Sequence, residues 1–147
     1  MKKSLILFVT IMLSIAVLGQ QPADKIIGTW ESVDSDVKLK FEFFRSDGKY
    51  FGKLLHASNM YEVDGKTPKT DSKNPDPKLR TRSRYGIINI TNLVFDDGEY
   101  SGGSLYNPEE GRTYRLKAQL TGPNDMDFRG YMGISLLGKT MKFKRVQ

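Results

Sequence analysis

Apolar and charged side chains alternate strictly along Val37-Lys38-Leu39-Lys40-Phe41-Glu42-Phe43. Successive side chains of an extended strand point to opposite faces, so this stretch predicts a strand with one buried face and one wet face. The same alternation recurs in 114–120, 126–130 and 141–144, whereas helical periodicity is nearly absent. A strand with a single apolar face is typical of antiparallel pairing. The chain is therefore predicted to be all-β.

Turn residues divide the chain at short intervals, as at Ser46-Asp47-Gly48, Asp96-Asp97-Gly98 and Asn107-Pro108-Glu109-Glu110-Gly111. Between such turns we expect eight strands, at 27–33, 37–45, 49–57, 85–95, 99–107, 112–121, 125–132 and 138–146. Eight short strands joined mostly by hairpins predict an antiparallel up-and-down β-barrel, which leaves no sheet edge exposed. An open β-sandwich is the alternative.

Composition excludes several classes of protein. The chain has 147 residues, of which 38% are hydrophobic, and a formal net charge of +6. This length favours one domain, and the hydrophobic content is too high for a disordered chain. There are no cysteines, which excludes a disulfide framework, a thiol nucleophile and a cysteine zinc site. Because the positive charges are spread over wet strand faces, a nucleic-acid partner is not expected.

Residues 1–19 have the layout of a secretory signal peptide. Two lysines precede an apolar run over 5–18, and small residues stand just before a cleavage site at Gln20. An uncleaved membrane anchor is the alternative, but the run is shorter than the ~20 residues that a spanning helix needs. We therefore expect a single exported domain over 20–147, periplasmic or extracellular, with no stable membrane insertion after cleavage.

The connection over 58–84 breaks the alternation and contains three prolines. Long connections in compact domains are usually functional or mobile. We expect this one to be the least ordered part of the protein, and to be either a solvated loop or a lid at the barrel mouth. Its Arg80, Arg82 and Arg84 are spaced by two, so an extended backbone would place all three on one face. That face is either simply wet or an anion clamp at the barrel mouth for a carboxylate or phosphate group of a ligand.

Recognisable catalytic motifs are missing from the sequence. It contains no G-x-S-x-G, H-E-x-x-H, Walker A or G-x-G-x-x-G pattern. His56 is the single histidine, and its place at the end of an expected strand favours a rim position without a ligand role. No catalytic residue, metal or cofactor is therefore expected, and the protein is not predicted to be an enzyme.

The single tryptophan points to the place where the barrel closes. Trp30 stands two residues after Gly28 in the first expected strand, and alternation puts Arg145 on the inward face of the last one. These strands meet at the closing seam, where a guanidinium can stack on the indole ring. Gly28 would leave room at this crowded seam. We expect this group to plug one end of the barrel, so that a ligand would enter at the other.

Several segments carry a resemblance to a known family. Ile27-Gly28-Thr29-Trp30, Asn74-Pro75-Asp76-Pro77 and the blocks 102–114 and 129–140 resemble the exported bacterial proteins grouped as domain of unknown function 2147. The G-x-W motif with a late arginine also resembles the calycin superfamily of lipocalins and fatty-acid-binding proteins. The resemblance implies a lipocalin-like barrel and an exported location, and it implies no particular activity.

Two functions remain open at this stage. The first is a binding module, because an eight-stranded barrel has room for one small apolar or amphipathic, lipid-like ligand. Eight apolar residues would line it, namely Leu39, Phe41, Phe43, Leu116, Leu120, Met126, Phe128 and Met141. The second is a structural or interaction protein whose barrel is filled by those side chains, and which contacts a partner through 58–84 and the turn at 133–138. We favour the binding module, with Phe41, Phe43, Phe128 and the three arginines as its candidate site.

Overall fold

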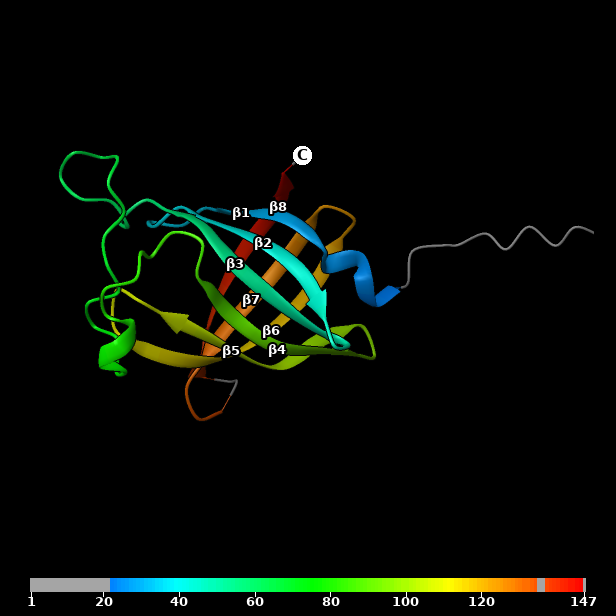
Figure 1. Ribbon diagram of the computed structural model, residues 1–147. Helices are drawn as coiled ribbons and strands as arrows, with labels where there is room; N and C mark the ends of the chain where they lie inside the picture. The colour runs from blue at the N-terminus through cyan, green and yellow to red at the C-terminus, as the bar shows by residue number, and fades with distance from the viewer. Residues whose placement is uncertain (1–21, 135–136, 147) are drawn as a thin grey trace, which may run out of the picture.

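The computed structural model describes residues 22–134 and 137–146. Eight antiparallel strands follow one another around a closed barrel, and the first pairs with the last (Figure 1). They are β1 (Gly28–Val33), β2 (Leu39–Ser46), β3 (Lys49–Ala57), β4 (Ile88–Asp96), β5 (Glu99–Asn107), β6 (Arg112–Gly122), β7 (Asp125–Tyr131) and β8 (Lys139–Val146). The up-and-down barrel is confirmed and the sandwich alternative is wrong. The expected signal peptide, residues 1–19, lies outside the described residues.

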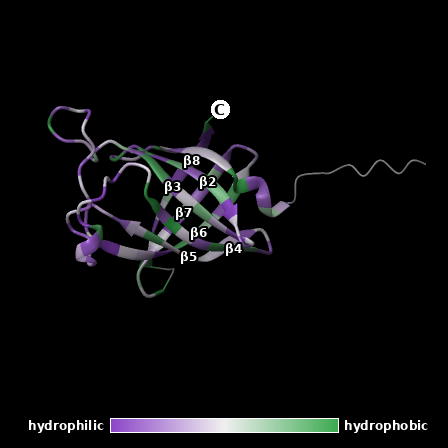
Figure 2. Ribbon diagram, viewed as in Figure 1, coloured by the Kyte–Doolittle hydropathy of each residue, from purple (hydrophilic) through white to green (hydrophobic). Residues whose placement is uncertain are grey.

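The apolar residues of the alternating segments point into the barrel, and the charged residues between them point to its surface. Phe41 and Phe43 are 2% and 1% exposed, whereas Glu42 between them reaches the surface and faces Lys53. Figure 2 shows the same alternation of hydrophobic and hydrophilic residues along the strands. The largest difference from the expected boundaries is at β4, which begins at Ile88 instead of residue 85. Gly86 has a φ of 78°, so the backbone there turns and cannot yet be a strand.

The short helix η1 (Pro22–Ile26) lies at one end of the barrel (Figure 1). Large side chains fill this end. Trp30, Tyr50 and Tyr100 are at most 2% exposed there. Each of these three side chains also donates a hydrogen bond to η1: Trp30 Nε1 to Ile26 O at 2.8 Å, Tyr100 OH to Ala23 O at 2.7 Å and Tyr50 OH to Asp24 Oδ1 at 2.7 Å. These bonds hold η1 across the barrel end as a plug.

Arg145 joins the closing seam to the same plug. Its guanidinium carbon lies 4.3 Å from the centre of the Trp30 ring. Nη1 donates to Ile27 O at 2.7 Å, and Nη2 donates to Lys25 O. Gly28 has a φ of 127°, and a Cβ added to it would lie 2.7 Å from Nη1 of Arg145. The glycine is therefore needed both for its backbone conformation and for the space that the guanidinium occupies.

The connection between β3 and β4 has an internal hydrogen-bond network that the broken alternation does not predict. Its centre is Asp71, which is fully buried. The Asp71 carboxylate accepts from Asn74 Nδ2 at 2.7 Å, from Arg82 Nε at 2.9 Å and from Tyr106 OH at 2.6 Å. Because Tyr106 belongs to β5, the network fastens the connection, including its short helix η2 (Pro77–Leu79), to the barrel wall. The low order expected for this segment stays a prediction.

Candidate ligand-binding cavity

A cavity of about 560 Å³ occupies the end of the barrel opposite η1. The β1–β2, β3–β4, β5–β6 and β7–β8 connections all lie at this end, because the strands run alternately up and down. Each of the first three connections contributes residues to the cavity wall, and Lys139 at the start of β8 contributes from the fourth side. Cavities of roughly 300–1,000 Å³ are typical of small-molecule sites.

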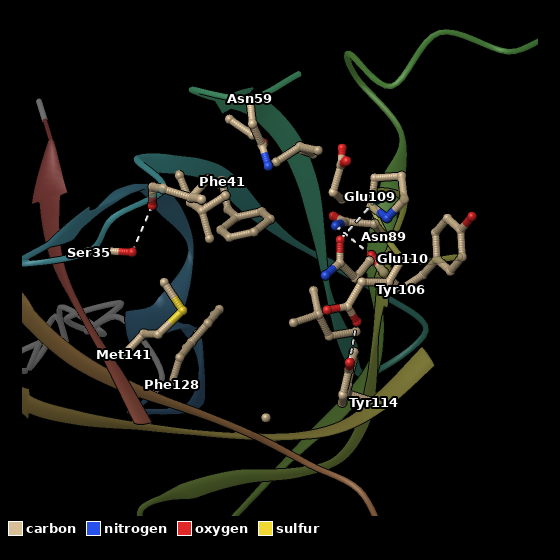
Figure 3. Close-up of a pocket in the computed structure, with 18 of the residues that line it drawn as sticks. Ser35, Phe41, Asn59, Asn89, Tyr106, Glu109, Glu110, Tyr114, Phe128 and Met141 are labelled. Atoms are coloured by element: carbon tan, nitrogen blue, oxygen red, sulfur yellow. Dashed lines mark hydrogen bonds between the residues drawn. The ribbon is translucent and has the colours of Figure 1, made fainter. Parts of the chain in front are cut away.

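Aromatic rings form the inner wall of this cavity. Phe41, Phe128 and Phe143 project from β2, β7 and β8, and their ring centres are 4.6 to 6.1 Å apart. Figure 3 shows Phe41, Phe128 and Met141 around the same space. Phe43 packs edge-on against Phe128, with ring centres 5.5 Å apart, and is 1% exposed. The barrel is thus filled towards η1 and hollow towards the other end.

Five of the eight apolar residues expected to line a cavity do so: Leu39, Phe41, Leu116, Phe128 and Met141. The other three pack in or against the filled part of the core: Phe43, Leu120 and Met126. Their position along the strand explains the difference. Leu120 and Met126 flank the β6–β7 turn, and Phe43 approaches the β2–β3 turn, and both turns lie at the η1 end. Alternation predicts which residues point inward, but it does not predict how far down the barrel the hollow extends.

The three arginines do not meet at the cavity. Arg84 lines it, whereas Arg80 Nε donates to Asn74 O at 2.8 Å and Arg82 Nε donates to Asp71 at 2.9 Å within the connection. The condition for a common face, an extended backbone over 80–84, is not met in the first part of this stretch. The Arg80 and Arg82 N–H groups donate to carbonyls three residues earlier, which makes turns of this stretch.

Arg84 is one of two cationic residues that line the cavity, the other being Lys139, and a protein carboxylate already holds it. Arg84 is 4% exposed, and its Nη1 lies 2.5 Å from Oε2 of Glu109 in the β5–β6 turn. Its Nε donates to Thr70 O at 3.0 Å. The hydrogen bond from Arg84 lowers the pKa of Glu109, so this carboxylate is ionised at neutral pH. A ligand carboxylate at Arg84 would have to displace Glu109.

Asn89 is a cavity residue that sequence reasoning missed. It lines the wall beside Tyr106 and Glu109 (Figure 3) and is 5% exposed. Its Nδ2 donates to Tyr106 O at 3.0 Å, but within the described residues no donor reaches its Oδ1. A signal was present in the sequence, because Asn89 interrupts the apolar run Ile87-Ile88-Asn89-Ile90. A polar residue inside such a run needs an explanation when it is buried.

Within residues 22–134 and 137–146, no three histidine, cysteine, aspartate or glutamate side chains gather in a way that could hold a metal ion. No helix in the same residues has the length and hydropathy to cross a membrane. His56 lies at the end of β3, where its ring centre is 5.7 Å from that of Tyr61.

A closed eight-stranded antiparallel barrel, plugged at one end and hollow at the other, defines this molecule as a lipocalin-like β-barrel. Residues 28–145 match the family described as "Uncharacterized protein conserved in bacteria (DUF2147)", and the chain belongs to that family. The family resemblance found in the sequence is thereby confirmed.

Comparison with solved structures supports the same class. The chain is similar to protein HP1028 from the human pathogen Helicobacter pylori, which is described as belonging to the lipocalin family. The two chains are 30% identical, the similarity covers 82% of each, and the TM-score is 0.71. No curated protein matches the chain.

Proposed function

We propose that this protein binds a small apolar or amphipathic, lipid-like ligand in the cavity at the open end of its barrel. The observation that carries the proposal is the 560 Å³ hollow above the rings of Phe41, Phe128 and Phe143. Apolar surface facing a cavity gains free energy when an apolar ligand covers it. The polar side chains around the rim suit a ligand that has a polar end.

Native mass spectrometry of the protein purified from its original host tests this proposal directly, because a retained small molecule would reveal its mass. Calorimetric titration with medium-chain alcohols and acids then tests the place of binding. Met141→Trp puts a large ring into the cavity and should weaken binding at least tenfold. Lys142→Trp puts the same ring on the exposed outer face of the same strand, so it should leave the affinity unchanged. Equal affinities in the two variants would refute binding in this cavity.

Exposed apolar side chains favour interaction with a partner protein as a second candidate function. Met132, Ile134 and Leu137 are 58%, 61% and 79% exposed at the β7–β8 turn, and Val63 is fully exposed within the β3–β4 connection. Residues 135–136 of the turn lie outside the described residues. The interior is not filled in the way this alternative assumed. Cross-linking in the original host, with Val63→Ser and Leu137→Ser as variants, tests this function separately from ligand binding.

We also propose that the protein works outside the cytoplasm, in the periplasm or beyond the cell. The two lysines, the apolar run over 5–18 and the small residues before Gln20 support this location. N-terminal sequencing of exported protein should find a start at or near Gln20. A retained Met1 would contradict the proposed cleavage.

A further inference from the structure

Asn89 carries, in the cavity wall, a polar atom that the protein itself does not satisfy. The residue is 5% exposed and lines the cavity, and its Oδ1 is itself buried and has no donor among the described residues. Tyr106 O can only accept a hydrogen bond, so Nδ2 must be the atom that faces it, at 3.0 Å. This contact fixes the orientation of the amide and leaves Oδ1 without a donor. Because Oδ1 is itself buried, a ligand group reaches it only when the neighbouring side chains of the cavity wall move aside.

A β-bulge sets the position of this residue. Gly52 of β3 pairs with Ile90 of β4, and the next residue, Lys53, pairs with Ile88. One step along β3 therefore corresponds to two steps along β4, and Asn89 is the extra residue without a partner on β3. Bulges of this kind redirect a side chain and are frequent beside functional sites. The bulge thus sets the position of Asn89 Oδ1 at the start of β4, where the neighbouring residues Ile88 and Ile90 are apolar.

The charges around Asn89 favour an uncharged donor on the ligand. Glu109 and Glu110 lie on the same part of the cavity wall (Figure 3), and Arg84 is paired with Glu109 at 2.5 Å. A ligand carboxylate would face two carboxylates and an acceptor oxygen, none of which can donate to it. An ammonium group would have to lose its water beside a residue that is almost fully buried, which is costly. A hydroxyl or an amide N–H can donate to Oδ1 without either penalty.

We propose that Asn89 Oδ1 accepts a hydrogen bond from a hydroxyl or amide N–H group on the ligand, whose apolar part lies against Phe41, Phe128 and Phe143. The proposal rests on the ligand-binding function argued above and names the chemical class of the ligand. It makes Asn89 a specificity-determining residue, because an acceptor left without a donor penalises every ligand that cannot donate.

Decanol and decyl methyl ether provide the test, since both carry an oxygen on the same alkyl chain and only the alcohol can donate. Calorimetry should show that the wild-type protein binds decanol about tenfold more tightly than the ether, as one buried hydrogen bond predicts. In Asn89→Leu this preference should disappear. Asn59→Leu removes another amide from the wall of the same cavity and should keep the preference. In a crystal structure of the decanol complex, the hydroxyl oxygen should lie ~2.8 Å from Oδ1.

Each contrary result has a distinct meaning. Equal binding of alcohol and ether by the wild-type protein would overturn the role of Asn89 while leaving the proposed cavity function intact. The same holds if the preference survives in Asn89→Leu, or if decanoate or decylamine binds more tightly than decanol. Absence of binding by all four compounds would overturn both proposals. The comparison of alcohol and ether and the structure of the decanol complex use only the wild-type protein. They therefore test the proposal even if Asn89→Leu fails to fold.

Discussion

Replacing Trp30 and Arg145 singly and together tests how the closed end of the barrel is held. The two residues pair across the β1–β8 seam, and the Arg145 guanidinium lies 4.3 Å from the centre of the indole ring. Trp30 is fully buried. Arg145 also donates to the carbonyls of Lys25 and Ile27, next to β1. Loss of either side chain should therefore loosen both the seam and the attachment of η1.

The size of each effect follows from these contacts. Trp30→Ala removes a buried indole and the hydrogen bond from Nε1 to Ile26 O, which should lower the free energy of unfolding by about 3–5 kcal/mol. Arg145→Ala removes a cation–π contact and two charge-assisted hydrogen bonds at a partly exposed position, which together should cost about 2–3 kcal/mol. Because both substitutions remove the same stacking contact, the double variant should lose about 1 kcal/mol less than the sum.

Urea denaturation followed by far-UV circular dichroism measures all four proteins, including those without a tryptophan. Lys142→Ala, an exposed change on the same strand as Arg145, is the matched control and should stay within about 0.5 kcal/mol of wild type. Losses that add to within about 0.5 kcal/mol in the double variant would refute the coupling. An Arg145→Ala loss no larger than that of the control would refute the role of Arg145 in closure.

Three further outcomes follow from buried or paired polar groups. Asp71→Ala should lower the free energy of unfolding by about 3 kcal/mol, because Tyr106 OH loses a buried acceptor. Urea denaturation measures this loss, and a value below ~1 kcal/mol would contradict the expectation. Glu109→Gln should cost about 1 kcal/mol at neutral pH, since the carboxylate is half-exposed. Folding lowers the pKa of Glu109, so the extra stability of the wild-type protein over Glu109→Gln should vanish as the pH falls through the folded pKa. A stability difference that stays the same in strong acid would contradict this. The pKa values of Tyr50, Tyr100 and Tyr106 are raised to about 12, chiefly by burial, so stability should decline as pH rises from ~10 through 12. Ultraviolet titration of the tyrosines should then show a late-ionising group, and a single step near pH 10 would speak against it.

The strands could be predicted from the sequence because their signal is local. Phe41 and Phe43 alternate with charged residues, and each strand follows this two-residue period whatever the rest of the chain does. Turn chemistry is local as well. Asp47 and Gly48 both have positive φ, at 48° and 73°, as the two central residues of a tight hairpin turn require. The barrel then follows from joining antiparallel neighbours until the first strand meets the last.

The candidate site could be predicted only in part, because its decisive features are not local. The sequence indicated that Phe41 and Phe128 would face inward, and both line the cavity. It did not indicate that Arg82 would turn back to Asp71, because that contact depends on how the connection folds onto Tyr106 of β5. It also missed Asn89, since a bulge depends on the pairing of two strands that lie about 36 residues apart in the chain.

One end of the barrel is filled by side chains and the other holds a cavity, and this difference supports the proposed binding function. At the η1 end, the ring of Trp30 is covered and its Nε1 donates to a carbonyl, so this side chain leaves no polar atom unsatisfied. At the other end, the rings of Phe41 and Phe128 face an open hollow and Asn89 Oδ1 has no donor within the described residues. A cavity lined by apolar groups and an acceptor without a donor both lower the stability of the free protein. One ligand with an apolar body and a donating end relieves both costs at once, and the plugged end supplies the rigid frame against which that ligand would bind.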